Sequence, residues 1–323
     1  MQQGRTVVVS APARLHLGFL DLNGGLGRRF GSLGLAIEGA GTRLSLSRAA
    51  ALEVHGPDGR RARGHLAALS ARFGRDGAYA LTIHQASPLH AGLGSGTTLA
   101  LALASAFRRL EGLGADLRGD ARMLARGERS GIGIAVFRRG GFVVDGGRGP
   151  ATGEPPILAR LPFPRNWRIL LVQDVSRRGI HGDRERAAFS ALAPFDEAEA
   201  DRICRLVLMQ LLPGLAEARI APFGKALRSI QERLGDYFAP TQGGRRIASP
   251  DVATALDALQ REGAHGVGQS SWGPTGFAFA ADEKEAVRLR AVLRDMGLPP
   301  NLALSICGAR NRGAEITSND ESP

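Results

Sequence analysis

The sequence is poor in cysteine and has no apolar run long enough to cross a membrane. Its two cysteines, Cys204 and Cys307, lack the close spacing of metal ligands, so we expect free thiols. The apolar runs fall short of the roughly 20 residues that a membrane-spanning helix needs, and the first residues lack a signal-peptide pattern. These absences predict a cytoplasmic protein that does not bind membranes.

The sequence also has few lysines and few aromatic residues. The net charge is +11, but Lys225 and Lys284 are the only lysines, and the arginines are dispersed along the chain. Aromatic residues make up 5% of the chain, which leaves few platforms for stacking bases. We therefore expect no nucleic-acid partner. A positive surface also steers small polyanionic substrates into a cleft.

The length of 323 residues suffices for two domains of ordinary size. Alternating and continuous apolar runs predict strands, and apolar residues at helical spacing predict helices, without strict βαβ repetition. This mixture predicts an α+β protein in two halves. The glycine- and proline-rich segment 146–156 predicts the boundary between domains at 1–150 and 157–310, and the polar residues 311–323 predict a disordered tail.

The most informative segment is Pro88–Thr98, which reads Pro-Leu-His-Ala-Gly-Leu-Gly-Ser-Gly-Thr-Thr. Its glycines let the backbone turn and approach a ligand closely. A glycine-rich turn that opens a helix, here the apolar run 99–110, offers free N–H groups and the positive end of the helix dipole to a phosphate. The residues expected to bind a phosphorylated ligand are Gly92, Gly94, Ser95, Gly96, Thr97 and Thr98.

Three motifs in order resemble those of the GHMP kinase superfamily. Pro88–Thr98 resembles its phosphate-binding motif, Ser10–Gly18 lies in the place of its first substrate-binding motif, and Gly266–Gly276 lies in the place of its third motif. The resemblance covers nearly the whole chain. It implies an N-terminal half like ribosomal protein S5, a ferredoxin-like C-terminal half, and a homodimer.

One departure argues against simple kinase chemistry. Family kinases that use a catalytic aspartate often present it within Ser-Gly-x-Asp, whereas Ser130–Gly133 of this chain ends in glycine. Phosphoryl transfer needs the acceptor hydroxyl to be oriented and its proton accepted. An ATP-dependent small-molecule kinase nevertheless stays the alternative, because some family members work without this base.

In this departure and in several strings along the chain, the sequence resembles one branch of the superfamily, the β-ribofuranosylaminobenzene 5'-phosphate synthases. The resemblance is carried by Ala13–Asp21, Gly31–Gly34, His90–Thr97, Arg126–Gly133, Gly140–Gly147 and, as the most specific string, Gly268–Thr275. It implies a decarboxylating pentosyltransferase that condenses 5-phosphoribosyl 1-pyrophosphate with 4-aminobenzoate and releases CO2 and pyrophosphate. Mg²⁺ is the cofactor that it implies.

Roles for single residues follow from this resemblance and from spacing. Arg14 and His16 lie two residues apart on one face of a strand. We expect Arg14 to contact a phosphate or the benzoate carboxylate and His16 to orient the substrate, the alternative being a surface arginine and a structural histidine. Asp21 either ligates magnesium, contacts a ribose hydroxyl or initiates a turn. Further candidates for substrate binding are Ser270, Ser271, Trp272, Arg178 and His181.

A third hypothesis, from a different class, is a protein of this fold that binds a ligand or nucleic acid without turnover. Turnover separates it from the two enzymes. Pyrophosphate and CO2 release without ATP would indicate the synthase, and ATP-dependent phosphorylation of a metabolite would indicate the kinase. DNA binding by the third would fall steeply with salt.

Overall fold

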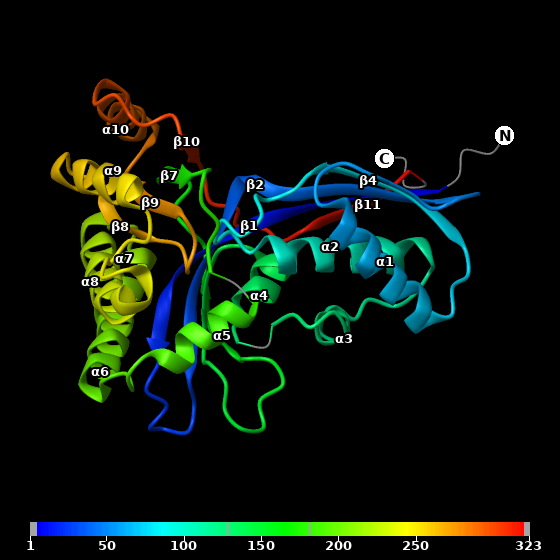
Figure 1. Ribbon diagram of the computed structural model, residues 1–323, viewed down its shortest axis with the longest axis horizontal. Helices are drawn as coiled ribbons and strands as arrows, with labels where there is room; N and C mark the ends of the chain where they lie inside the picture. Colours follow the sequence, from blue (N-terminus) through cyan, green and yellow to red (C-terminus); the bar gives the residue numbers. More distant parts are fainter. Residues whose placement is uncertain (1–4, 128, 181, 320–323) are drawn as a thin grey trace.

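The computed structural model describes residues 5–127, 129–180 and 182–319 and shows two halves joined by two long strands (Figure 1). The N-terminal half is a sheet covered on one face by helices, and the C-terminal half is a smaller sheet covered by helices. Among the described residues, no helix combines the length and apolar character that crossing a membrane requires. The α+β class expected from the sequence is confirmed.

The N-terminal sheet has the strand order β11-β1-β2-β4-β3, with β5 pairing with β2 and β6 pairing with β5. Its helices include α2, whose inner face is almost continuously apolar and packs against β1 and β2. The elements of this half are β1 (Thr6–Asp21), β2 (Phe30–Ala49), β3 (Glu53–His55), α1 (Gly59–Phe73), β4 (Ala78–Gln85), α2 (Ser95–Leu110), α3 (Leu117–Met123), α4 (Ile132–Arg139), β5 (Phe142–Asp145), β6 (Ile157–Leu161) and β11 (Glu315–Ser318).

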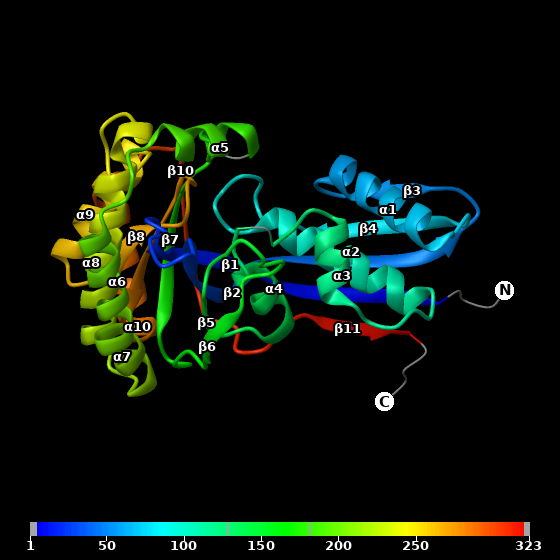
Figure 2. The ribbon, with the colours of Figure 1, turned by 90° about the horizontal axis from the view of Figure 1, so that it is seen from below.

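Strands β1 and β2 run through both halves of the molecule. From the sequence, each reads as two shorter strands, because Pro12 interrupts the first and Gly39 and Gly41 the second. The structure keeps each strand whole by placing a register shift between Ala11 and Ala13. A proline is tolerated at such a bulge because no ladder hydrogen bond is needed there. The two strands therefore carry residues of one hairpin from the first half into the second (Figure 2).

The C-terminal half is an antiparallel sheet of order β10-β7-β9-β8 with helices packed around it. Three of its helices begin at capping side chains: Asp196 accepts from Ala198 N–H, Ser249 from Val252 N–H, and Asp282 from Glu285 N–H. The elements are β7 (Arg168–Asp174), α5 (Gly182–Ala191), α6 (Glu197–Leu206), a π-helical segment (Val207–Leu211), α7 (Leu212–Ala216), α8 (Ile220–Phe238), a 3-10 segment (Ala239–Gln242), α9 (Pro250–Arg261), β8 (His265–Gln269), β9 (Thr275–Ala280), α10 (Glu283–Asp295) and β10 (Leu302–Cys307).

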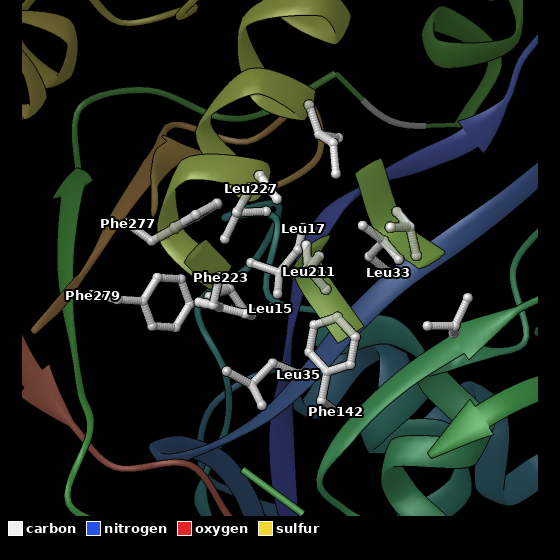
Figure 3. Close-up of a cluster of buried hydrophobic side chains, with 14 of the residues drawn as sticks. Leu15, Leu17, Leu33, Leu35, Phe142, Leu211, Phe223, Leu227, Phe277 and Phe279 are labelled. Carbon is white, nitrogen blue, oxygen red and sulfur yellow. The ribbon is translucent and has the colours of Figure 1, made fainter. Parts of the chain in front are cut away.

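A shared hydrophobic core fixes the two halves against each other. Leucines from β1 and β2 meet phenylalanines from α8 and β9 in one buried cluster (Figure 3). Leu15 and Phe223 are both fully buried within it. Since burying such side chains contributes roughly 1.5–3 kcal/mol each, this cluster holds the middle of β1 in a fixed place between the halves. Arg14 and His16 lie on either side of Leu15.

Two boundaries expected from the sequence need correction. Residues 146–156 do form a loop, but β6 follows it and pairs with β5, so the N-terminal sheet continues past the expected boundary. The expected disordered tail is also wrong for Glu315–Ser318, which pairs antiparallel with Val7–Ser10 of β1. Three of the four residues of this strand are exposed. An edge strand is held by backbone hydrogen bonds and needs few buried side chains, so its polar composition did not predict a strand.

Candidate active site

The glycine-rich loop ends in the first turn of α2, as its composition predicts. Gly94 caps the helix with φ 74°, and its carbonyl accepts from the amides of Thr97 and Thr98 at 3.1 Å each. The amides of Ser95 and Gly96 stand before the first helical hydrogen bond, where an α-helix leaves its N–H groups without intrahelical partners. Ser95 and Thr98 are buried, and Thr98 Oγ1 donates to Gly94 O at 3.2 Å. The loop therefore has the geometry of an anion-binding turn.

The guanidinium of Arg14 lies directly against this loop. A Cβ added to Gly94 would lie 3.2 Å from Arg14 Nε and 3.5 Å from Nη2, so only glycine leaves this space open. Nε and Nη1 of Arg14 are buried and make no hydrogen bond. Burial lowers the pKa of Arg14 to about 10, although the charges of Glu185 and Asp145 act to raise it. A charged, desolvated group with unmet donors is stabilised by an anion.

The first and third motifs meet the loop through close backbone contacts. Gly92 packs against the Ser270 carbonyl, and a Cβ on Gly273 would lie 2.7 Å from Gly92 N. Gly179 N donates to His90 O at 2.8 Å. Residues 90–92, 179 and 270–273 therefore meet at one junction. Non-glycine residues His90 and Ser271 adopt φ 57° and φ 56° here. Left-handed backbone of this kind is retained mostly at functional sites, because the surrounding fold must hold it.

Ser270 holds the junction together rather than presenting its hydroxyl to a ligand. Its Oγ accepts from His16 N at 3.0 Å and donates to Gly92 O at 2.8 Å, and the residue is fully buried. It therefore positions β1 against the glycine loop. Its predicted phosphate contact would require breaking one of these two bonds.

His16 is a neutral hydrogen-bond donor in a buried setting. Burial, with the nearby charge of Arg14, lowers its pKa well below the usual range. Nδ1 accepts from Gly18 N at 3.3 Å, which leaves the ring proton on Nε2. His16 lines a small cavity with Phe19, Phe238 and Trp272. Its Nε2–H can therefore meet a substrate there but cannot supply a positive charge at neutral pH.

Aromatic rings enclose this cavity. Trp272 contacts Phe238 at 4.5 Å and Phe189 of α5 at 5.2 Å between ring centroids, and His16 contacts Phe19 at 4.6 Å. Trp272 is 4% exposed, and its Nε1 is buried without a hydrogen-bond partner. A buried indole N–H normally finds an acceptor. The cavity thus combines aromatic walls with an unused donor.

The structure explains the glycine that replaces the kinase aspartate. Gly133 lies in the first turn of α4, where a Cβ would be 3.1 Å from Thr97 Cγ2 and 3.6 Å from Thr97 Oγ1. Thr97 therefore occupies the space that a longer side chain at position 133 would need. The neighbouring carboxylate, Asp145, is fully buried and accepts from Ser130 Oγ at 2.9 Å and from Gly131 N at 2.9 Å. It braces this turn.

Of the remaining candidates that the structure describes, Arg178 lies next to the loop and Asp21 does not. Asp21 ends β1, seven residues beyond Arg14, or roughly 20 Å at strand rise. Its Oδ1 accepts from Asn23 N at 2.6 Å and Gly24 N at 3.1 Å, which is the turn-initiating alternative. Arg178 is exposed next to the Gly179 junction, and His181 lies outside the described residues.

Sequence reasoning missed two arginines beside Gly96 and a histidine near them. A Cβ on Gly96 would lie 3.0 Å from Arg126 Nη1 and 3.4 Å from Arg61 Nη1. His65 faces both arginines from α1. Arg126 begins the string Arg126–Gly133 that carries the family resemblance, but no role was expected for it. Arg61 and His65 precede the loop by about thirty residues, and the fold alone brings them near it.

Comparison with family models identifies both halves. Residues 61–141 match the model of the GHMP kinases N-terminal domain, and residues 211–297 match that of the GHMP kinases C-terminal region. Two archaeal proteins named beta-ribofuranosylphenol 5'-phosphate synthase are similar over most of their length. The one from Archaeoglobus fulgidus is 34% identical, over 94% of this chain and 97% of its own, and that from Methanothermobacter thermautotrophicus is 31% identical, over 95% and 98%.

Solved structures agree on the fold. Homoserine kinase from Cytophaga hutchinsonii has a TM-score of 0.69 at 17% identity, covering 98% of this chain and 99% of its own. Mevalonate diphosphate decarboxylase from Staphylococcus aureus has a TM-score of 0.64 at 14% identity, covering 97% and 98%. At such identities the likeness shows the fold, which serves more than one chemistry.

Proposed function

Because this chain belongs to the GHMP kinase superfamily and, within it, to the family of the archaeal beta-ribofuranosylphenol 5'-phosphate synthases, we propose that it is a decarboxylating pentosyltransferase. Its substrates are 5-phosphoribosyl 1-pyrophosphate and a benzoate with an electron-donating para substituent. The observation that carries this proposal is the buried guanidinium of Arg14 against Gly94, with Thr97 filling the space beside Gly133. The loop is built to hold an anion without a carboxylate base at position 133.

The reaction places little demand on proton transfer. The bond from ribose C1 to the pyrophosphate oxygen breaks, and C1 bonds to the ring carbon that bears the carboxylate. The bond to that carboxylate then breaks, its electron pair restores the aromatic ring, and CO2 leaves. No proton is gained or lost overall. The protein must hold the two reactants in line and stabilise negative charge on the departing pyrophosphate.

Arg14 and the α2 N-terminus supply that stabilisation. The guanidinium donates to the pyrophosphate from one side, and the amides of Ser95 and Gly96 donate from the end of the helix. Since these groups are fixed in place before the substrate arrives, little reorganisation is needed as charge develops.

Mg²⁺ is proposed to enter with the pyrophosphate. Among the residues that the structure describes, no group of three or more His, Cys, Asp or Glu side chains could hold a metal ion. Mg²⁺ is commonly bound through substrate phosphates with few protein ligands, and it neutralises their charge. The hydroxyls of Ser95 and Thr97 at the loop would contact it. Asp21, about 20 Å away along β1, does not fit this role.

The aromatic cavity is the proposed acceptor site. His16 Nε2–H and the unused Trp272 Nε1–H donate to the polar groups of the benzoate, and the surrounding rings pack against its faces. The cavity volume of about 30 Å³ is smaller than the roughly 150 Å³ of a cavity known to hold benzene. A bound acceptor ring would therefore extend out of this volume or displace a neighbouring side chain.

The para substituent of the acceptor is an amino or a hydroxyl group. The sequence resemblance implied 4-aminobenzoate, whereas the archaeal relatives are named for a phenol, which corresponds to a hydroxyl in that position. Both groups donate electrons to the ring carbon that attacks. Parallel kcat/KM measurements with 4-aminobenzoate and 4-hydroxybenzoate assign the acceptor.

The deciding experiment uses the purified full chain with 5-phosphoribosyl 1-pyrophosphate, either benzoate and Mg²⁺, without ATP. We expect equimolar release of pyrophosphate and CO2 and a product in which sugar and ring are joined by carbon. ATP-dependent phosphorylation of a metabolite without that release would instead establish the kinase alternative. The expected homodimer is a separate proposal, tested by the mass of the protein in solution.

A further inference from the structure

Strand β1 is irregular where it passes the aromatic cavity. Its pairing with β2 shifts between His16 and Gly18, so Leu17 is an extra residue without a counterpart on β2. A bulge of this kind leaves the backbone groups of the extra residue outside the ladder and redirects the neighbouring side chains. Because Leu17 is fully buried, its carbonyl needs a hydrogen-bond partner within the protein.

The side chain of Gln231 from α8 provides this partner. Its Nε2 donates to Leu17 O at 2.8 Å, and its Oε1 accepts from Gln269 N at the end of β8, also at 2.8 Å. A Cβ at Gly268 would overlap Oε1, so the glycine leaves room for the amide. An amide donates and accepts through separate atoms, whereas an ionised carboxylate only accepts. Gln231 therefore joins the bulge of β1 to the strand that leads to Trp272.

The side chain of Gln269 continues this connection into the turn that carries Trp272. Gln269 Nε2 donates to Ser271 O and to Gln242 Oε1, at 2.9 Å each. Its Oε1 accepts from Ala248 N at 2.7 Å, and the residue is buried. A buried chain of amides whose donors and acceptors are satisfied makes its surroundings rigid. The left-handed backbone of Ser271, with φ 56°, is thus held directly before Trp272.

The two ends of this hydrogen-bonded chain adjoin the two donors of the aromatic cavity. Leu17 directly follows His16, and Ser271 directly precedes Trp272. The two donors come from opposite ends of the sequence, so local structure alone does not set the distance between them. A misplacement of about 1 Å in groups that orient a substrate can lower the rate about 100-fold. The connection between them therefore bears on how well the acceptor is oriented.

We propose that Gln231 and Gln269 are positioning residues for the benzoate acceptor. Together they set the place of His16 relative to Trp272 through the neighbouring backbone, to which both amides are already bonded. This inference rests on the proposed function, in which the two donors bind the benzoate. It adds that the aromatic cavity is held in shape by a polar chain from a third element, α8.

The first test replaces the Gln231 amide by an apolar side chain of similar size. In Gln231→Leu we expect the KM of the benzoate to rise at least tenfold, because Leu17 O and Gln269 N lose their common partner. The KM of the ribosyl substrate should stay within twofold, since the glycine loop does not depend on this connection. The control is Gln260→Leu, the same substitution on α9 away from the residues that line the cavity, and it should match wild type. Equal changes in both KM values of Gln231→Leu, or no change, would overturn the positioning role.

A conservative variant makes the same hydrogen bond depend on pH. In Gln231→Glu the ionised carboxylate accepts from Gln269 N but cannot donate to Leu17 O, whereas the protonated carboxyl does both. The KM of the benzoate in this variant, divided by that of wild type at the same pH, should therefore fall at least threefold from pH 8 to pH 5. A ratio that does not change with pH contradicts the proposed connection.

The other titratable side chains that line the cavity keep their charge over this range of pH. They are His16 and Arg246. Burial lowers the pKa of His16 well below its usual range, and the hydrogen bonds of Arg246 to Asp236 raise the pKa of that arginine. The pH dependence of the ratio therefore reports on the introduced carboxyl group.

Trp272 provides a readout that does not depend on activity. The chain has two tryptophans, Trp167 and Trp272, so labelling with 5-fluorotryptophan gives two ¹⁹F NMR signals, which Trp272→Phe assigns. In Gln231→Leu we expect the Trp272 signal to shift and the signal of Trp167, which lies in the shared core, to stay. An unmoved Trp272 signal, or equal movement of both signals, would overturn the positioning role.

Failure of this inference and failure of the proposed function give different results. If wild type releases no pyrophosphate with either benzoate while the Trp272 signal responds in Gln231→Leu, the proposed function fails and the connection from Gln231 to Trp272 stands. If wild type turns over but Gln231→Leu changes neither the KM of the benzoate nor the Trp272 signal, the proposed function stands and the positioning role fails.

Discussion

At the scale of single residues, we expect Arg14 to lower the stability of the free protein and to strengthen the binding of pyrophosphate. Its buried guanidinium lacks partners for Nε and Nη1, and replacing such a group by an apolar side chain of similar volume often stabilises a fold. We expect Arg14→Met to keep or raise the melting temperature of the free protein while weakening pyrophosphate at least 100-fold. Thermal unfolding with and without pyrophosphate checks both parts; a variant that loses stability but retains affinity would assign Arg14 a structural role.

His65 makes a separate prediction about pH. Its folded pKa of about 4 lies below the ordinary value of 6.5, so the unfolded chain binds more protons between these values. The free energy of unfolding contributed by this group is therefore complete above pH 6.5 and decreases as the pH falls toward 4, by an amount that solvent screening reduces because His65 is only partly buried. Urea unfolding at pH 7, 6 and 5 should show a shallower decrease for His65→Gln than for wild type. Equal slopes would refute the assignment.

Which residues could be predicted depended on sequence distance. Arg14 was predicted to contact an anion because it lies in a motif, and the structure places it against Gly94. Arg61 could not be predicted, since nothing local distinguishes it from the other arginines of this arginine-rich chain. Arg126 begins the string Arg126–Gly133 that carries the family resemblance, but that resemblance assigned it no role. Asp21 was given three alternatives, and the hydrogen bonds that it accepts from Asn23 N and Gly24 N fit the turn-initiating one.

At the scale of elements, the contact between α4 and α2 leaves little room at position 133 for the catalytic aspartate of a kinase. We expect Gly133→Ala to be mild, because Thr97 Cγ2 at 3.1 Å can shift by a few tenths of an ångström. Gly133→Asp would press a carboxylate against Thr97 and the bound pyrophosphate, so substrate affinity should fall at least tenfold. The rates of pyrophosphate release by Gly133→Ala and Gly133→Asp distinguish the effect of side-chain size from the effect of negative charge. Gain of ATP-dependent phosphorylation by Gly133→Asp would show that only the base had been missing.

Helix α5 is the element best suited to move when the acceptor binds. None of its residues is buried, and it is held by Phe189 against Trp272 and by the Arg129–Glu185 ion pair at 2.6 Å. It lies between the two halves in both views (Figures 1 and 2). Because the Phe189 ring packs against Trp272, which lines the small cavity, Phe189→Ala should lower the acceptor KM several-fold and leave the KM of the ribosyl substrate unchanged. Ser190→Ala, exposed on the same helix, is the control. A raised acceptor KM would instead make Phe189 part of the binding wall.

At the scale of the whole molecule, the sequence predicted the class and the two halves but not how the chain closes. Strand periodicity identified the pieces of β1 and β2, yet only the shared core around Leu15 and Phe223 shows that one hairpin serves both halves. The loop 146–156 predicted a boundary by composition, and hydrogen bonding between β5 and β6 overrides it. Pairing between distant segments is what local pattern does not encode.

The C-terminal strand β11 completes the N-terminal sheet, and truncation tests what this pairing contributes. The end of the described chain returns to its beginning: β11 pairs with Val7–Ser10, and Thr6 N donates to Asn319 Oδ1 at 2.8 Å. Removing residues 314–323 would uncover the edge of β1, while removing 320–323 leaves this pairing intact. Because the longer truncation removes the backbone hydrogen bonds of this pairing, we expect it to lower the free energy of unfolding relative to the shorter one.

Catalysis should respond differently from stability. Arg14 and His16 lie beyond the paired stretch of β1, where the core and Ser270 hold the strand. The longer truncation should therefore unfold at lower urea and aggregate more readily through its open edge, while kcat per folded molecule stays within twofold of wild type. Urea unfolding and active-site-normalised kinetics on both truncations decide this. A loss of kcat in fully folded protein would contradict this expectation. It would mean that β11 positions Arg14 through the length of β1.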